Sequence, residues 1–351
     1  MRLQIKEQYP WTTLPLITNA PMAGFAGAEL ALTVSAAGGI GFIGSANDMR
    51  LLEGCLKSAT SSLENAKINK PANGTLPIGV GFLLFAAKLE EAVAVIAKYP
   101  PAVIWLSCPK ETDDFAIWVR AIRSVSPSTS IWISIASIAK GIQVAEKCSP
   151  DALVMQGSDA GGHGPRPGAG IISLVPEMRD SLDKMNFQKM CIFATGGIAD
   201  GRGVAAALAS GADGVVLGTR FLASKEVELP AEEYRDVILR TNDGGFGTVR
   251  GTIFDEIKGK SIWPAAYDGR AVANTSYNDF LSGVSVEEIR ERYNNAAMEP
   301  HKGFGGDVRA AIWAGTGVGL VNEIKGAAEI VKELRDGAFQ SLTNALGRFT
   351  V

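Results

Sequence analysis

Eight short apolar segments alternate with segments of helical periodicity, and this alternation constrains the fold more than any other feature of the sequence. The apolar segments occupy residues 15–22, 39–44, 76–82, 102–107, 130–136, 152–157, 191–197 and 213–219. Helices are expected between them, at residues 27–37, 48–59, 87–98, 113–124, 138–147, 173–184 and 200–210. The apolar segments are nearly continuous, as is typical of parallel strands covered on both faces. Eight such units predict an α/β fold of the (β/α)8 TIM-barrel type.

An open doubly wound sheet is the alternative arrangement for the same alternation. In that fold a dinucleotide-binding motif, GxGxxG, commonly follows the first strand. Here the first strand is followed by NAPMAGFAG, in which the glycines have a different spacing. The closed barrel is therefore the preferred prediction.

The alternation stops after the eighth apolar segment. Residues 224–305 carry more charged and aromatic side chains, with two helical segments, PAEEYRDVILRT and SVEEIRERYNNAA. We expect a barrel formed by residues 1–223 and 306–351, with a mainly helical insertion at 224–305 between strand eight and helix eight. Such an insertion starts where strand eight ends, so it is expected to cover the active-site end of the barrel as a lid. The candidates to line this lid are Trp263, Tyr267 and Phe280.

Composition and charge argue against several classes of function. The net charge of −3 provides no basic surface for nucleic acid or for an anionic membrane. No uninterrupted apolar run approaches the ~18 residues of a membrane-spanning helix. The four cysteines are widely spaced, and the N-terminal MRLQIKEQYPW has no apolar signal region. We therefore expect reduced thiols in a cytoplasmic protein.

Glycines lie at the ends of the seventh and eighth predicted strands, as a pair in ATGGIADGRGV and as a single residue in LGTRF. In (β/α)8 barrels these two loops commonly hold a phosphate, because glycine lets backbone N–H groups approach an anion closely. We expect a phosphorylated ligand at Gly196, Gly197, Gly218 and Thr219. The sequence has no P-loop lysine motif, and its two histidines are 138 positions apart, which argues against a metal site. The phosphate is therefore expected to belong to an organic cofactor.

A histidine lies in the glycine-rich segment LVMQGSDAGGHGPRPGAG, residues 153–170, after the sixth predicted strand. A single histidine is often structural, but His163 is placed at a strand end that should open into the barrel mouth. The ordinary pKa of histidine lies near neutrality, which suits proton transfer. We predict that His163 is functional, that His301 is structural or at the surface, and that Cys108 is a buried thiol. The segment NAPMAG, residues 19–24, is stiffened by proline and could lie along a flat ring.

These motifs together resemble one known family. NAPMAG, QGSDAGGH, ATGGIADGRGVAAALASGADGVVLGTRF and GLVNEIKGAAEIV resemble the nitronate monooxygenases, formerly called 2-nitropropane dioxygenases. The segment TIFDEIKGKSIWPAAYDGRA resembles the fungal and related members. The resemblance implies an FMN-dependent (β/α)8 barrel and identifies His163 with the catalytic histidine of the family.

The resemblance also implies which residues bind FMN. Those assigned to the flavin ring and its surroundings are Ala20, Pro21, Met22, Gly81, Gln156, Ala160 and Gly161. Those assigned to the flavin phosphate are Gly196, Gly197, Gly218 and Thr219. The sequence departs from the family in having Gly81 where an asparagine is frequent and Thr316 where a glutamine is common, and in lacking a lysine at the end of the fifth strand. These departures leave the substrate open.

Three activities are consistent with these residues. The first is oxidation of alkyl nitronates by O₂ to a carbonyl compound and nitrite, extending to neutral nitroalkanes if His163 abstracts an α-proton; otherwise His163 would position the anion. The second is an NAD(P)H-dependent quinone or enoyl-thioester reductase on the same barrel. The third is a flavin- or phosphate-binding barrel without turnover, against which the inward-facing position expected for His163 argues.

Overall fold

An eight-stranded parallel sheet forms the centre of the molecule. The computed structural model describes residues 2–44, 48–69 and 71–349. The strands are β1 (Leu16–Asn19), β2 (Phe42–Gly44), β3 (Leu76–Leu83), β4 (Pro101–Ser107), β5 (Ser130–Ile135), β6 (Ala152–Gln156), β8 (Cys191–Thr195) and β9 (Gly214–Leu217). They pair in the order β1-β9-β8-β6-β5-β4-β3-β2. A parallel bridge between Thr18 and Ile40 joins the two edges, so the sheet is a nearly closed barrel, as the alternation predicted.

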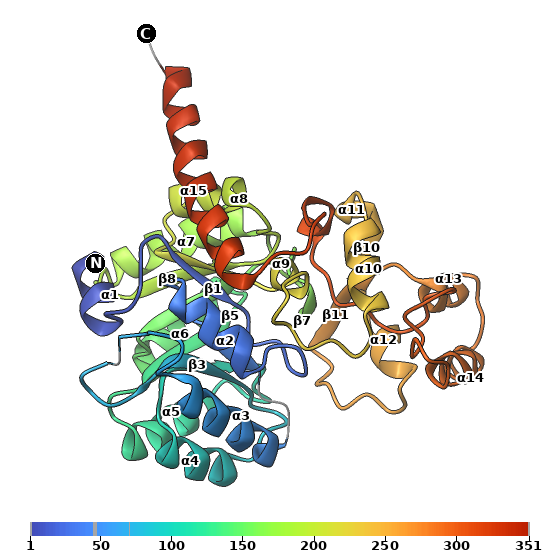
Figure 1. Cartoon of the computed structure of the whole chain (residues 1–351), viewed down its shortest axis with the longest axis horizontal. Coiled ribbons are helices and arrows are strands. Elements are labelled where there is room, and N and C mark those ends of the chain that lie inside the picture. Colours follow the sequence, from blue (N-terminus) through green and yellow to red (C-terminus); the bar gives the residue numbers. More distant parts are fainter. Residues whose placement is uncertain (1, 45–47, 70, 350–351) are drawn as a thin grey trace.

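Helices surround this barrel (Figure 1). They are α2 (Ala28–Ala36), α3 (Met49–Ser62), α4 (Leu89–Lys98), α5 (Asp114–Val125), α6 (Ile138–Cys148), α7 (Ile171–Lys184), α8 (Gly201–Ala209) and α15 (Ala327–Leu346), preceded by α1 (Arg2–Gln8). The helices predicted between the strands are confirmed to within a few residues. Helix α5 shows why they form, because it buries Phe115, Trp118, Val119 and Ile122 on one face at helical spacing.

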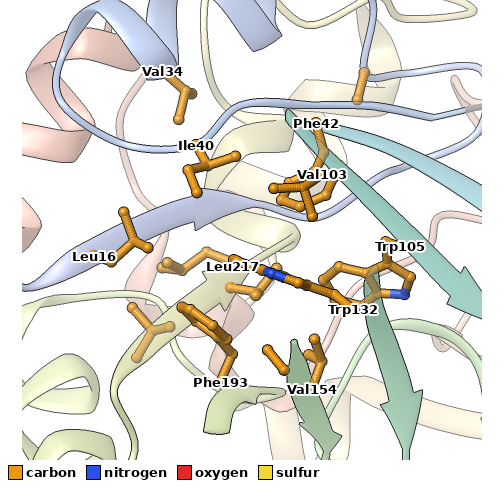
Figure 2. Close-up of a cluster of buried hydrophobic side chains, with 14 of the residues drawn as sticks. Leu16, Val34, Ile40, Phe42, Val103, Trp105, Trp132, Val154, Phe193 and Leu217 are labelled. Carbon is orange, nitrogen blue, oxygen red and sulfur yellow. The ribbon is translucent and has the colours of Figure 1, made fainter. Parts of the chain in front are cut away.

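Large side chains fill the interior of the barrel (Figure 2). Trp132 stacks on Phe193 with ring centroids 4.0 Å apart, and Phe42 lies 5.5 Å from Trp132. The indole Nε1 of Trp132 donates to the hydroxyl of Tyr9, 3.1 Å away. Tyr9 directly follows α1, and the side chain of the adjacent Gln8 bonds to Ser130 where β5 begins, so this end of the barrel is closed. The open end lies where the strands terminate.

The chain beyond β9 forms a second group of elements. They are α9 (Thr219–Leu222), α10 (Glu233–Arg240), α11 (Gly244–Gly247), β10 (Thr248–Gly251), α12 (Ile253–Glu256), β11 (Tyr267–Val272), α13 (Thr275–Leu281), α14 (Val286–Ala297) and the 3₁₀ helix η1 (Thr316–Leu320). The short η2 (Gly347–Phe349) instead follows α15. The two helices predicted at PAEEYRDVILRT and SVEEIRERYNNAA are present as α10 and α14. A separate apolar cluster, built around Phe254, Ile257 and Ile289, packs within this region.

A small antiparallel sheet in this region was not predicted. It has the order β10-β11-β7, in which β7 (Gly162–Pro165) is part of the glycine-rich segment after β6. The pairing aligns Gly269 of β11 with His163 of β7. The sequence GHGP has neither apolar alternation nor β-branched residues, so only its pairing with a strand about 100 residues later makes it extended.

Helix α15 returns to the barrel and packs against α8 and α2. Backbones come very close here, since a Cβ added at Gly201 would lie 2.4 Å from the carbonyl carbon of Gly337. The second half of α15 projects from the body of the molecule (Figure 1). In the described ranges, no helix is both long and apolar enough to cross a membrane.

Candidate active site

A cavity of about 590 Å³ opens where the barrel strands end. All twelve site residues predicted from the sequence line it: Ala20, Pro21, Met22, Gly81, Gln156, Ala160, Gly161, His163, Gly196, Gly197, Gly218 and Thr219. They come from five barrel strands and the loops that follow them, and from β7, so only the closure of the barrel brings them together. The size lies within the range of ~300–1,000 Å³ that is usual for small-molecule and cofactor sites.

The glycine pair after β8 offers free backbone donors to one part of this cavity. Gly196 and Gly197 have φ angles of +115° and +73°, which favour glycine over other residues. For neither N–H group does the described chain supply a hydrogen-bond acceptor. Across the cavity wall, the hydroxyl of Thr219 accepts a hydrogen bond of 2.9 Å from the backbone N–H of Gly315. The loops after β8 and β9 and the segment before η1 thus form one surface.

The turn after β1 forms another wall. The N–H of Ala20 donates to the carbonyl of Leu217 in β9, and the N–H of Met22 donates back to the carbonyl of Ala20. A Cβ added at Gly81 would lie 2.3 Å from Cβ of Pro21, far inside van der Waals contact. The absence of a side chain at position 81, a departure from the related family, therefore matches the close approach of Pro21.

His163 lies on β7, and a hydrogen bond from Gln156, the last residue of β6, fixes its main chain. The Gln156 amide nitrogen donates to the His163 carbonyl over 2.9 Å, and the Gln156 oxygen accepts from the hydroxyl of Ser134 over 3.2 Å. The imidazole Nε2 lies 2.9 Å and 3.0 Å from the two carboxylate oxygens of Asp255 on α12. Both side chains of this pair are only 12% exposed.

Aromatic rings enclose the imidazole. Trp263 stacks on His163 with centroids 3.7 Å apart and an angle of 8° between the planes. Trp313 lies 4.6 Å away on a tilted plane. Of the three proposed lid residues, Trp263 lines the cavity. Tyr267 packs against Trp263 at 6.2 Å, whereas Phe280 is 44% exposed on α13 and neither it nor Tyr267 is among the cavity-lining residues.

Several lining residues were not predicted from the sequence: Asp255, Lys258, Lys260, Trp313 and Tyr234. The hydroxyl of Tyr234 accepts a hydrogen bond of 2.8 Å from the N–H of Trp313, and burial raises the pKa of Tyr234 above its ordinary range. These residues come from segments without strand–helix alternation. The available signal was the concentration of charge in TIFDEIKGK, which holds two acidic residues, Asp255 and Glu256, and two lysines.

The expected buried thiol is confirmed, and it also lines the cavity. Cys108 is 8% exposed, and burial raises the pKa of its thiol to about 12. It is therefore a neutral group near pH 7. His301 is half-buried and lies outside the set of cavity-lining residues, as expected. Within the described ranges, no group of three or more His, Cys, Asp or Glu side chains could hold a metal ion.

Two arginines of the small sheet, Arg250 on β10 and Arg270 on β11, donate hydrogen bonds to backbone carbonyls in the segment that contains β7. Arg250 on β10 pairs with Asp268 on β11 and donates to the backbone carbonyls of Gly164 and Pro165, at 3.0 and 3.2 Å. Arg270 donates to the carbonyl of Ser158 at 3.2 Å. Burial lowers the pKa of Arg270, and the nearby Arg250 lowers it further. The conformation of the His163 segment is thus fixed by residues about 90–110 positions later in the chain.

Comparison with known proteins identifies the family. The family model described as nitronate monooxygenase matches residues 83–337. The chain is 38% identical over 346 residues to the nitronate monooxygenase npaC of Metarhizium robertsii, covering 97% of this chain and 96% of that protein. It is 36% identical over 353 residues to the nitronate monooxygenase of Neurospora crassa, covering 95% and 92%.

Solved structures agree with the fold. FabK from Thermotoga maritima superposes with a TM-score of 0.74 at 23% identity, with 99% of both chains covered. Nitroalkane oxidase from Streptomyces ansochromogenes gives a TM-score of 0.68 at 21% identity, covering 94% of this chain and 98% of that one. At these identities the likeness shows the α/β barrel alone. On the family match and the two fungal relatives, the chain belongs to the nitronate monooxygenase family.

Proposed function

We propose that this protein oxidises alkyl nitronates with O₂, using FMN, to give a carbonyl compound and nitrite. The observation that carries the proposal is the convergence of all twelve sequence-predicted residues, His163 included, on one cavity. Family membership and the two fungal nitronate monooxygenases support the same reaction.

The residues of the cavity fit FMN. The free N–H groups of Gly196 and Gly197 suit a phosphate, as do the strand-end loops from which they come. At Gly218 an added Cβ would lie 3.8 Å from Cβ of Ala20 and Sδ of Met22, in ordinary van der Waals contact, so the loop after β9 lies beside the turn after β1. The flat turn at Ala20 and Pro21 and the neighbouring Gly81 leave a surface for a planar ring. When bound, FMN would supply the two-electron acceptor for the reaction.

His163 would act on the substrate in one of two ways. A nitronate is already an anion, so a protonated imidazole would hold it by a charge-assisted hydrogen bond. A neutral nitroalkane needs to lose its α-proton, which a neutral imidazole can accept. Trp263 and Trp313 pack around the imidazole, whose side chain is 12% exposed, so screening by solvent is weak there and either interaction is strengthened.

We further propose that residues 1–223 and 306–351 form the FMN-binding barrel and that 224–305 act as a lid. In support, Asp255, Lys258 and Trp263 of this segment line the cavity. Part of the segment, around Phe254, Ile257 and Ile289, packs in its own apolar cluster, whereas Tyr234 and Val237 pack with the barrel core. Its closure over the ligand would exclude solvent and limit substrate size.

The test is O₂ uptake by the purified yellow protein on addition of a small alkyl nitronate, with nitrite measured in the same sample. A parallel sample receives NADH and a quinone. Rapid uptake with nitrite formation, and no NADH oxidation, is the expected result. Inactivity with nitronate together with NADH oxidation would contradict the proposal and indicate the reductase instead.

A further inference from the structure

Among the described residues, a single ring nitrogen of His163, Nε2, has a hydrogen-bond partner. Nε2 is within 3.0 Å of both carboxylate oxygens of Asp255. In the described part of the chain no hydrogen bond is made by Nδ1, although the ring lines the cavity. A carboxylate has only acceptor atoms, so the proton in this interaction is carried by Nε2.

We propose that Asp255 is a positioning residue that holds His163 in the tautomer with its proton on Nε2, so that Nδ1 is the atom that meets the substrate. The inference rests on the proposed function, because it names the atom that performs the role given there to His163. In the neutral imidazole, Nδ1 has a free electron pair and accepts the α-proton of a nitroalkane. The electron pair of the broken C–H bond stays on the substrate, which becomes the nitronate.

The same pair also serves the anionic substrate. Once Nδ1 carries a proton, it becomes a donor that can bind the nitronate oxygens, and the negative charge of Asp255 balances the imidazolium. Both side chains are largely shielded from water, so the attraction between them is screened less than at the surface. Asp255 thus supports both roles of His163 through a single contact.

The surroundings prevent the ring from exchanging its two nitrogens. Trp263 lies parallel to the imidazole at 3.7 Å, so rotation of the ring about its Cβ–Cγ bond would drive it into the indole. On the side of β11, a Cβ at Gly269 would lie 3.3 Å from Nε2 and 2.4 Å from the ring of Trp313. The glycine therefore lets β11 lie against the ring while Nε2 stays on Asp255.

The small number of histidines makes the tautomer directly measurable. The chain contains two histidines, so holoprotein labelled with ¹⁵N-histidine gives two imidazole spin systems, and His301→Gln assigns them. The wild-type spectrum should show His163, in its neutral form, with the proton on Nε2. This spectrum decides the tautomer even if a variant at position 255 does not fold.

Three variants connect the tautomer to activity. Asp255→Asn can offer an N–H as well as an oxygen, so the tautomers of His163 should mix, and kcat/KM for a nitroalkane should fall at least about tenfold at unchanged flavin content. Asp255→Glu keeps the carboxylate and should recover part of the activity. Glu256→Gln, on the same helix and with the same change in charge, should leave both the spectrum and the rate unchanged.

The inference is overturned if neutral wild-type His163 carries its proton on Nδ1, or if Asp255→Asn retains both the tautomer and the rate. Failure of the proposed function has a different signature. The wild-type protein would then oxidise no nitronate, while the Nε2–H tautomer and its dependence on Asp255 would still be observed.

Discussion

His163 and Asp255 are 92 positions apart in the sequence, yet the imidazole Nε2 lies within 3.0 Å of both carboxylate oxygens. The glycine pair at Gly196 and Gly197 was recognisable because positive φ angles, and the close approach to an anion that we propose for it, both favour glycine. His163 was recognisable because of its place at a strand end. Its partner Asp255 was not, because it is one of many acidic residues in a segment without periodicity, and only the fold brings it within 3.0 Å of Nε2.

We predict that His163→Asn keeps the bound flavin but lowers turnover of nitroalkane by about 10²-fold or more, the usual contribution of a general base. The imidazole lines the cavity from β7, whereas the loops proposed to bind the flavin phosphate follow β8 and β9, so the variant should retain flavin. Steady-state kinetics and the visible spectrum measure the two effects. His301→Asn, outside the cavity, is the matched control, and full activity of His163→Asn would refute the role.

Position 81 provides a second prediction at this scale. Gly81→Asn would restore the residue frequent in the family, but its Cβ would collide with Pro21, 2.3 Å away. We expect weaker flavin binding, measured as the flavin-to-protein ratio after gel filtration. Combining the change with Pro21→Ala, which removes Cγ and Cδ but leaves Cβ, should recover little of the binding. Normal flavin content in Gly81→Asn alone would show that the turn after β1 moves freely.

The strands and helices of the barrel could be predicted because the apolar pattern that defines each element lies within its own short stretch of sequence. The strands are nearly continuous apolar runs, and α5 has apolar residues at the spacing of an amphipathic helix. β7 was missed because its partner β11 is distant in the sequence, and β10 and β11, which pair with each other, were missed because TVRG and YDGRAV are short and contain glycine and charged residues. Gly162 and Gly269 within these strands suggest turns when the sequence is considered alone.

Helix α15 offers a comparison within one element. Leu334 is 3% exposed against the barrel, whereas Leu346 is 72% exposed on the projecting end. Leu334→Ala should lower the free energy of unfolding by about 2–5 kcal/mol through lost burial and a residual cavity. Leu346→Ala should change it by less than about 0.5 kcal/mol. Denaturant titration measures both, and equal effects would contradict the packing of α15 described here.

Two glycines, Gly54 inside α3 and Gly41 just before β2, differ in the space available for an added side chain. An added Cβ at Gly54 in α3 meets no atom within 4 Å, so Gly54→Ala should stabilise the protein by about 0.5–1 kcal/mol through helix propensity. At Gly41 an added Cβ would lie 1.8 Å from the carbonyl oxygen of Ala31, so Gly41→Ala should destabilise it. Melting temperatures of the two variants should therefore move in opposite directions, and a shared direction would be inconsistent with this geometry.

In the whole molecule, two parts of the chain line the cavity: the loops of the barrel and the segment after β9. The barrel supplies the glycine-rich loops proposed to hold FMN, and the segment after β9 supplies Asp255 and Trp263 around His163. The small sheet β10-β11-β7 connects the barrel to the segment after β9, since β7, which carries His163, follows a barrel strand and β11 belongs to the later segment. The sequence predicted a lid over the cavity, but not that this segment would also partner the histidine.

The central claim is that a flavin in this cavity takes electrons from a nitronate. The most direct measurement is an anaerobic titration of the purified protein with a small alkyl nitronate, following the visible spectrum of the bound flavin. We predict loss of the oxidised flavin spectrum with nitronate and no change with NADH. A spectrum that changes with NADH and is unaffected by nitronate would contradict the account.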